Sequence, residues 1–373
     1  MSTVRMDKNP KERYNISPKT KIPLATWAEA GYNALITPAA PGRGRRYIAM
    51  NNPSVRETVY NRPFIFQRAD PYILRCADGS CYFTASVPEY DRIVLRHAGT
   101  LRGLREAPER TVWVKHESGP QSIHVWAPEL HEIDGAWYIY YAAGDKDDVW
   151  EIRPYVLRCT GDPMADPWEE LGPMRPADGD PFSFRAFSLD ATVFCHRGER
   201  YMVWAEKVGV GKQISNLYIA RMASPTKLDT VQVLLTTPDY DWERGDFWVN
   251  EGPAVLHHDG KIFLTFSANT TGELYCMGML WTDEDADLLD PASWTKLRQP
   301  VFRSDDSKEV HGPGHNSFVK AEDGVTDLCV YHARQYSRLV GNPLYDPNRH
   351  VYIMPIAYDE AGMPEFQHLP QEW

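Results

Sequence analysis

The sequence predicts an all-β protein, a five-bladed β-propeller, from three observations. One segment recurs five times, its copies follow one another at intervals of about 60 residues, and long helical periodicity is absent. Each copy is a short apolar strand, a turn centred on glycine, and a second strand rich in Tyr, Phe, Val and Ile that ends in small residues. This pattern is typical of a β-hairpin.

The five copies span residues 69–86, 126–144, 188–206, 250–269 and 314–333. Their turn glycines, separated by 56, 63, 62 and 64 residues, are Gly79, Gly135, Gly198, Gly260 and Gly324. A unit of this size accommodates a four-stranded blade with its loops, and blades arranged around an axis protect the sheet edges. A β-sandwich would also contain many short strands, but it gives no reason for a regular recurrence.

The repeat divides the chain into two expected parts. Residues 61–373 form the predicted propeller, and residues 1–60 precede it as an N-terminal extension that lacks the repeat. The extension is rich in Pro and Gly and contains a basic run at residues 42–46. We expect it to pack on the propeller or to lend a strand that closes it; a partly disordered tail is the alternative.

The charge and the aromatic content of the chain limit the classes of partner that it can bind. Forty Lys and Arg against 51 Asp and Glu give a formal net charge of −11, which argues against binding to nucleic acid or to an anionic membrane surface. Twelve Trp and 20 Tyr suit stacking on sugar rings, although the same side chains also fill propeller cores. Residues 1–21 contain no apolar segment of the kind found in secretion signals, so a cytoplasmic location is expected.

The first strand of each copy should begin at a functional position. Because the innermost strands of a propeller line its central channel, equivalent strand starts meet at one mouth. Counting nine residues back from each turn glycine reaches these positions, with Asp190 next to the third: Asp70, Trp126, Leu189, Glu251 and His315. Three copies therefore bring an acid to one place, which costs stability unless the acids have a chemical role. Turn capping and metal coordination are the structural alternatives.

Three acids at one mouth suit hydrolysis of a glycosidic bond. The reaction needs one carboxylic acid that protonates the departing oxygen and one carboxylate that activates water or attacks the sugar. A third acid nearby can raise the pKa of the first by like-charge repulsion and orient it by hydrogen bonding.

Several segments resemble those of glycoside hydrolase family 43, in particular its exo-acting α-L-arabinofuranosidases. They span about residues 61–360 and include ADPYI (69–73), HVWAPELH (124–131), SLDATVF (188–194), FWVNEGPAV (247–255) and HGPGHNSF (311–318). The resemblance implies a five-bladed propeller that inverts the anomeric configuration. Inversion requires the two catalytic carboxyls to lie roughly 6.5–9.5 Å apart.

The resemblance also implies roles for four residues. Asp70 corresponds to the general base that deprotonates the attacking water, Glu251 to the general acid, and Asp190 to the residue that tunes and orients that acid. His315 corresponds to an axial histidine that helps to hold a hydrated cation, calcium or sodium, in the central channel. From chemistry alone a single His is more often structural, because calcium prefers oxygen ligands. No organic cofactor is implied.

Three further residues are candidates for binding the sugar. Arg349 corresponds to an arginine that hydrogen-bonds ring hydroxyls, although an arginine paired with Asp346 would look the same in sequence. Trp126 is a candidate wall or stacking platform, with a core tryptophan as the alternative. Tyr90, expected on a loop after the first hairpin, is a candidate for shaping the pocket.

The predicted function is the release of terminal α-L-arabinofuranose from arabinan or arabinoxylan oligosaccharides. A β-xylosidase or a dual xylosidase and arabinofuranosidase is the nearest alternative, because the two sugars present similar hydroxyl patterns. A non-catalytic sugar-binding propeller is a remote alternative, since it would not need three acids at one mouth. The 69 residues before Asp70 depart from the family pattern; they are expected to narrow the pocket or to mediate formation of a homo-oligomer.

Overall fold

The computed structural model describes residues 62–208, 214–245 and 247–367, all within the unit Val55–Trp373. These residues form 22 strands and five short 3₁₀ helices, which confirms the all-β prediction. None of the helices in the described residues is long and apolar enough to cross a membrane. The expected N-terminal extension, residues 1–60, lies outside the described residues, so its boundary and role stay predictions.

All five predicted hairpins are present and antiparallel. Their turn glycines have φ between 74° and 89°, a region that glycine adopts without steric cost, as a tight hairpin turn requires. The hairpins are β1 (Ala69–Arg75) with β2 (Cys81–Ser86), β5 (Ile123–Ile133) with β6 (Ala136–Asp145), β9 (Ser188–His196) with β10 (Glu199–Val208), β14 (Trp248–His258) with β15 (Lys261–Ala268), and β18 (His311–Lys320) with β19 (Asp327–Arg334).

Further strands extend each hairpin on the side of its second strand. They are β3 (Arg92–Ala98) and β4 (Arg110–Val114); β7 (Asp148–Cys159) and β8 (Glu169–Pro173); β11 (Ile214–Ser224) with β12 (Lys227–Leu228) and β13 (Val233–Thr236); β16 (Cys276–Asp283) and β17 (Thr295–Lys296); and β20 (His350–Pro355). Two parallel residue pairs between β11 and β14 join the third and fourth groups into a nine-stranded sheet. Strands β21 (Ala357–Tyr358) and β22 (Pro364–Glu365) pair separately.

The five 3₁₀ helices are short elements of the connections between strands. They are η1 (Arg102–Arg105), η2 (Asp241–Glu243), η3 (Pro291–Ser293), η4 (Asp306–Lys308) and η5 (Pro343–Tyr345).

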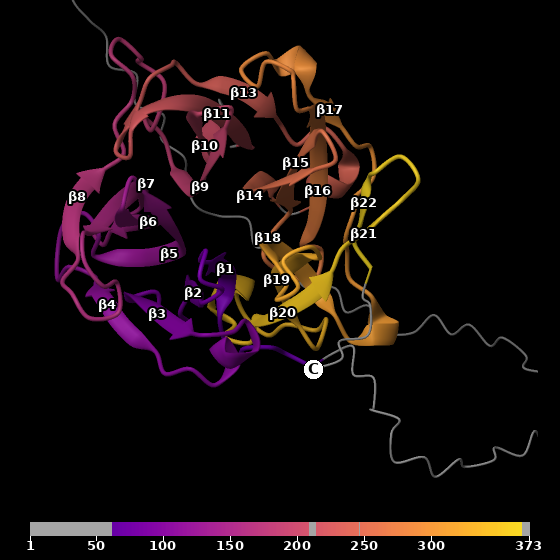
Figure 1. Cartoon of the computed structure of the whole chain (residues 1–373), viewed down its shortest axis with the longest axis horizontal. Helices are drawn as coiled ribbons and strands as arrows, with labels where there is room; N and C mark the ends of the chain where they lie inside the picture. Colours follow the sequence, from indigo (N-terminus) through magenta and orange to yellow (C-terminus); the bar gives the residue numbers. More distant parts are fainter. Residues whose placement is uncertain (1–61, 209–213, 246, 368–373) are drawn as a thin grey trace, which may run out of the picture. The chain divides into compact units, whose positions relative to one another are not determined.

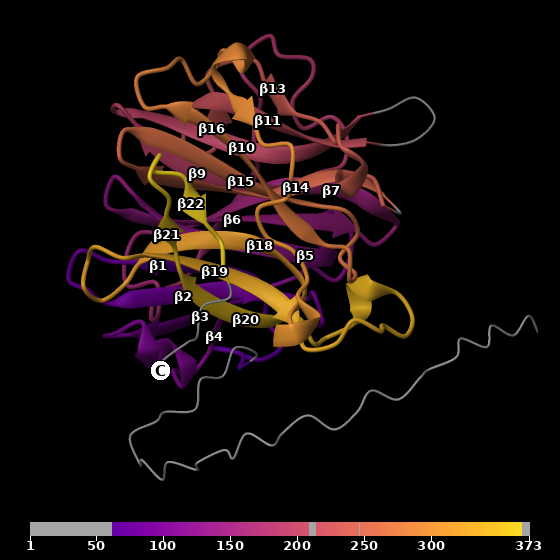
Figure 2. The ribbon, with the colours of Figure 1, turned by 90° about the vertical axis from the view of Figure 1, so that its right-hand side faces the viewer.

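The first strands of the hairpins contact one another in cyclic order. Strand β1 contacts β5, β5 contacts β9, β9 contacts β14, β14 contacts β18, and β18 contacts β1. Figure 1 shows β1, β9, β14 and β18 nearer the middle of the view and β4, β8 and β17 at its rim, and Figure 2 gives the view at 90°. The start and end of the described chain are also joined, because the Phe64 N–H donates to the Val351 carbonyl at 2.7 Å.

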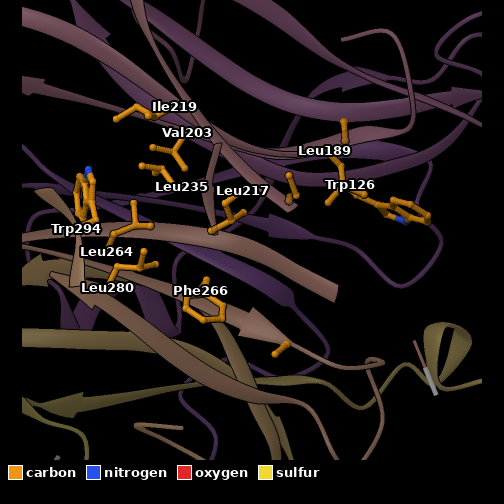
Figure 3. Close-up of a cluster of buried hydrophobic side chains, with 14 of the residues drawn as sticks. Trp126, Leu189, Val203, Leu217, Ile219, Leu235, Leu264, Phe266, Leu280 and Trp294 are labelled. Carbon is orange, nitrogen blue, oxygen red and sulfur yellow. The ribbon is translucent and has the colours of Figure 1, made fainter. Parts of the chain in front are cut away.

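The apolar core consists of clusters between neighbouring hairpin groups. The cluster in Figure 3 joins the third and fourth groups, with Val203 and Leu217 on one side and Leu264 and Leu280 on the other. Another joins the first and fifth groups through Phe83 and Val330, among others. Because side chains of a strand alternate between the two faces, a sheet that packs on both faces needs apolar residues throughout. Strand β2 is accordingly buried at every position.

We expect Leu264→Ala to lower the free energy of unfolding by about 2–5 kcal/mol, because the side chain is fully buried and its loss leaves a cavity between the third and fourth groups. Chemical denaturation monitored by tryptophan fluorescence measures this change. Val340→Ala, at a side chain that is 92% exposed, is the matched control and should change the free energy by less than about 0.5 kcal/mol. Equal effects of the two substitutions would contradict this view of the core.

Candidate active site

A cavity of about 1360 Å³ brings six of the seven predicted site residues together. They come from all five hairpin groups and are Asp70, Trp126, Asp190, Glu251, His315 and Arg349. The volume exceeds the 300–1,000 Å³ typical of small-molecule sites, so the cavity has room for more than one sugar ring.

A β-bulge shapes each first strand where it reaches the cavity. The register with the second strand shifts there, and the residue at the shift has a positive φ: 53° at Asp70, 45° at Ala127, 54° at Asp190, 55° at Gly252 and 42° at His315. Bulges re-aim side chains next to active sites, and non-glycine residues with positive φ carry strain that the surroundings must offset. The positive-φ residue lies nine positions before the turn glycine in the first and fifth hairpins, the position counted from sequence, and eight positions before it in the other three.

Asp70 is a buried carboxylate with a lowered pKa. Its Oδ2 accepts a hydrogen bond from Ser86 Oγ at 2.6 Å, and its Oδ1 lies 3.3 Å from His315 Nδ1 and 3.4 Å from an Arg349 guanidinium nitrogen. Burial alone would raise the pKa of Asp70, but attraction to His315 and Arg349 outweighs burial and holds this pKa well below its ordinary value. Asp70 is therefore ionised at neutral pH.

Arg349 supplies the positive charge beside Asp70 at neutral pH. Burial lowers the pKa of His315, and it lowers the pKa of His332 to about 3, so both imidazoles are neutral at neutral pH. Protonated His315 attracts Asp70 only at lower pH, the range in which Asp70 itself would titrate. The Asp70 N–H donates to His332 Nδ1 at 3.1 Å, which requires that nitrogen to be unprotonated. An arginine stays protonated in proteins, so Arg349 is the cation that keeps Asp70 ionised.

Asp190 ties β9 to β14 and has a raised pKa. Its Oδ2 accepts a hydrogen bond from the Gly252 N–H at 3.0 Å. Gly252 has a φ of 55°, and a Cβ at this position would lie 3.1 Å from the His315 ring, so the close approach requires glycine. Burial first, and then the charges of Glu251 and Asp70, raise the pKa of Asp190 well above its ordinary value.

Glu251 has a raised pKa and a single tyrosine donor. Tyr275 donates its hydroxyl proton to Glu251 Oε1 at 2.8 Å. Burial raises the pKa of Glu251 to about 7, although the hydrogen bond from Tyr275 opposes this shift by stabilising the ionised form. Because Asp190 and Glu251 repel each other when both are ionised, the two carboxyls hold at least one proton between them near neutral pH.

Arg349 lies immediately before β20 and is buried. It donates one hydrogen bond to Asp70 Oδ1 at 3.4 Å and another to the Tyr90 hydroxyl. Asp346, the alternative partner considered from sequence, pairs instead with Arg334, whose Nε lies 3.2 Å from Asp346 Oδ1. The guanidinium of Arg349 is thus directed to the cavity and not to the neighbouring loop.

Tyr90 and Trp126 meet edge to face, with ring centroids 5.7 Å apart and planes at 86°. Trp126 lines the cavity although it is only 8% exposed, and the His124 ring stacks on it at 4.4 Å. The Tyr90 hydroxyl donates to the Leu344 carbonyl at 2.5 Å and accepts from Arg349. Tyr90 does not itself line the cavity of the described residues; its contacts fix the position of Arg349.

His315 lies between two acids. Its ring Nδ1 is 3.3 Å from Asp70 Oδ1 and 3.7 Å from Asp190 Oδ2. Its backbone N–H donates to Ser267 Oγ at 2.7 Å. Glu129, buried on β5, is close enough to act electrostatically on both His315 and Asp190. A donor set of carboxylate oxygens with one imidazole fits a hard cation such as calcium, which takes mainly oxygen ligands.

Three residues of the site were not predicted from sequence: Ser86, Tyr275 and Lys207. Ser86 bridges two strands, because its Oγ also accepts the Ala127 N–H at 2.8 Å, and a usable signal was its position among the small residues that end each second strand. Lys207 lines the cavity with its ammonium 3.8 Å from the Phe187 ring centroid, and its charge counteracts the rise in the Glu251 pKa that burial causes. No recurring pattern pointed to Tyr275 or Lys207.

Exposed aromatic rings also line the cavity. Trp150, Phe182 and Phe247 are 55%, 59% and 63% exposed. The backbone after Phe182 is held by Glu206, whose carboxylate accepts hydrogen bonds from the N–H groups of residues 184–186 at 2.9–3.0 Å. These rings present flat apolar faces on which a sugar ring can stack.

Proteins with known activities are similar to this chain over most of its length. It is 46% identical over 334 residues to the extracellular exo-α-(1→5)-L-arabinofuranosidase of Streptomyces avermitilis. The matched residues are 89% of this chain and 67% of that protein. It is 48% identical over 289 residues to the enzyme of the same name from Streptomyces chartreusis, with 77% and 86% covered. The crystal structure of an α-L-arabinofuranosidase from Lactobacillus brevis superposes with a TM-score of 0.77 at 51% identity, covering 83% of this chain and 96% of that one.

These relatives correct the location expected from sequence. Both Streptomyces enzymes are named extracellular, which contradicts the expected cytoplasmic location. The expectation was wrong because it rested on what residues 1–21 lack, and the lack of an apolar segment there does not report where a protein works.

Family membership follows from a match that includes every residue of the cavity described above. The model of the family described as glycosyl hydrolases family 43 matches residues 60–364, which contain Asp70, Asp190, Glu251 and Arg349. The chain is a glycosidase and belongs to glycosyl hydrolases family 43.

Proposed function

We propose that this protein releases terminal α-L-arabinofuranose from arabinan or arabinoxylan oligosaccharides with inversion of the anomeric configuration. The observation that carries the proposal is that Asp70, Asp190 and Glu251, from three different hairpins, line one cavity, with the Arg349 guanidinium 3.4 Å from Asp70. The lowered pKa of Asp70 and the pKa of Glu251, raised to about 7, agree with a base and an acid. The names of the similar enzymes support arabinofuranose as the sugar.

In the proposed reaction, Asp70 takes a proton from a water molecule whose oxygen attacks the anomeric carbon. The bond from that carbon to the glycosidic oxygen breaks as Glu251 gives its proton to the departing oxygen. The water has entered opposite the departing group, so the configuration inverts. Burial and the charge of ionised Asp70 favour the protonated form of Glu251. Asp190 is fixed by its hydrogen bond to Gly252, and its charge is coupled to that of Glu251, so the two carboxyls hold at least one proton between them.

The cavity provides separate places for the terminal sugar and for the rest of the oligosaccharide. Arg349 has a planar guanidinium that suits two adjacent hydroxyls, and its contacts with Asp70 and Tyr90 hold it near the base. Trp126 forms a wall beside it. Trp150, Phe182 and Phe247 are exposed enough to stack on further sugar residues.

We propose a five-bladed propeller for the described residues. The proposal is supported by the cyclic contacts of the first strands and by the apolar clusters, each of which joins neighbouring hairpin groups. Further support is that β11 and β14 share only two residue pairs, so the nine-stranded sheet consists of two blades in light contact. A crystal structure in which the number of hairpin groups around the axis differs from five would contradict it.

We propose that one calcium or sodium ion binds beside His315. His315 with the nearby carboxylate of Glu129 would hold it, and water molecules would complete its shell. When bound, the ion would supply positive charge beneath the sugar-binding part of the cavity. The concentration of buried carboxyls there, balanced by Arg349, supports a cation at this place.

Asp70→Asn and Glu251→Gln should each lower kcat for arabino-oligosaccharides by about 10²–10⁴-fold, because each removes a proton transfer. Turnover of 4-nitrophenyl α-L-arabinofuranoside and of arabino-oligosaccharides measures this, and proton NMR of the first product should show the inverted anomer. Glu117→Gln, at an exposed acid, is the matched control and should keep full activity. Full activity in either active-site variant would refute the assignment, and faster turnover of the corresponding xyloside would favour a xylosidase.

The pH dependence of kcat should report the pKa of Glu251. The acid must be protonated, so kcat falls as the pH rises through about 7. Asp70 must be ionised, and because its pKa is lowered, kcat stays high well below pH 5. Tyr275→Phe removes the hydrogen bond that stabilises ionised Glu251, so its pKa rises. The decrease in kcat with rising pH, the falling limb of the pH profile, should therefore shift to higher pH. Tyr201→Phe, outside the cavity, serves as the control, and a limb that moves to lower pH in Tyr275→Phe would contradict the assignment.

Removal of the proposed ion should lower thermal stability. After treatment with EDTA, addition of calcium is expected to raise the Tm of the wild type by a few degrees, because a ligand that binds only the folded state stabilises it. The shift should disappear in His315→Gln and persist in His97→Gln, at an exposed histidine far along the chain. An equal calcium shift in His315→Gln would place the ion elsewhere.

A further inference from the structure

A second group of metal-ligating side chains lies outside the cavity. His196, His257 and Glu284 each offer one ring nitrogen or carboxylate oxygen, and these three atoms lie within 4.8 Å of one another. His196 ends β9, His257 lies near the end of β14, and Glu284 follows β16, so the group connects the third and fourth hairpin groups.

The group lies at the opposite ends of the strands that carry the catalytic acids. His196 follows Asp190 by six positions on β9, and His257 follows Glu251 by six positions on β14. At a rise of about 3.3 Å per residue, this places the group about 20 Å from the acids. It is therefore a separate site and not part of the cavity.

His196 supplies a second, independent observation. His196 is only 6% exposed, and its Nε2 has no hydrogen-bond partner in the part of the chain that the structure describes. A buried polar atom without a partner in the protein is costly, and a water molecule or an ion can satisfy it. The His196 and His257 rings stack with centroids 5.8 Å apart and planes at 23°, so the two rings are neighbours, and one nitrogen of each lies within 4.8 Å of the other and of a Glu284 oxygen.

The backbone holds the third ligand near the two histidines. The Glu284 N–H donates to the Gly260 carbonyl at 2.8 Å, which ties Glu284 to the hairpin turn that follows His257. The ligand atoms of a tetrahedral zinc site are about 3.4 Å apart for bonds of about 2.1 Å. The side chains of His257 and Glu284 are exposed and can rotate to close the remaining gap.

We propose that His196, His257 and Glu284 form a zinc-binding site that fastens the third hairpin group to the fourth. Two imidazole nitrogens and one carboxylate oxygen suit zinc, with water as the fourth ligand, whereas calcium prefers an all-oxygen set. The exposure of two ligands gives the ion a route from solvent. The ion would add a link at the strand ends opposite the cavity, between two groups that are also joined by the residue pairs of β11 and β14, by the hydrogen bond from Gly252 to Asp190 and by apolar contacts.

The test uses the full chain without a polyhistidine tag, stripped of metal with EDTA and titrated with zinc chloride at pH 7.5. Calorimetry should show one zinc per chain at this site, and thermal denaturation should show a rise in Tm of about 5 °C at a hundredfold excess over Kd. His257→Ala and Glu284→Gln, both at exposed side chains, should lower zinc affinity at least tenfold and abolish the Tm shift. These variants keep the fold testable even if His196→Ala, at a buried position, does not fold.

The controls separate this site from other zinc-binding surfaces. His97→Ala and Asp285→Asn, an exposed histidine elsewhere and an exposed acid next to Glu284, should bind zinc as the wild type does. Glycosidase activity should be equal in wild type and in His257→Ala, because the group is about 20 Å from the acids. Wild-type protein that binds no zinc, or His257→Ala and Glu284→Gln proteins that bind it unchanged, would overturn the proposal.

Discussion

The structure depends on the burial of several carboxyls in one cavity. Asp70, Asp190 and Glu251 cannot all be ionised there, because each charge raises the pKa of its neighbours. Arg349 determines which carboxyl is ionised at neutral pH. It contacts Asp70, which stays ionised, while Asp190 and Glu251 hold at least one proton between them. A single guanidinium therefore separates one ionised carboxyl from two that hold a proton between them, and this separation is what the proposed base and acid require. The hydrogen bond from Arg349 to Tyr90 fixes the position of that charge, and the division of roles depends on it.

Presenting these side chains costs conformational energy that the rest of the fold offsets. Asp70, Asp190 and His315 have positive φ values at β-bulges, a conformation that non-glycine residues rarely adopt. The bulges persist because the remainder of each first strand is locked into a regular antiparallel ladder and packed against both neighbouring hairpin groups. Apolar burial between the groups thus supports the strain at the strand ends, which explains why core and active site are built from the same strands.

How far sequence could predict the structure depends on how local each feature is. The hairpins were predictable, because a tight turn needs a glycine with positive φ at a fixed place between two apolar runs. The meeting of Asp70, Asp190 and Glu251 followed from the repeat. The count from glycine to bulge was not predictable, because it is eight in three hairpins and nine in two and depends on where the register shifts. Tyr275 precedes a third strand, outside the recurring segment, so its hydrogen bond to Glu251 depends on tertiary structure that no local pattern encodes.

Glu206 and Glu251 show that hydrogen bonding, more than burial, separates a structural carboxylate from a reactive one. Both line the cavity. Glu206 is 3% exposed and accepts hydrogen bonds from three consecutive backbone N–H groups and from Trp204 Nε1 at 2.9 Å, so its lone pairs are committed to holding the backbone that follows Phe182. Glu251, which is more exposed, receives its hydrogen bond within the described residues from Tyr275 at one oxygen. This arrangement suits the proposed role of Glu251 as the acid, because a carboxyl with an uncommitted oxygen can exchange a proton without dismantling the structure around it.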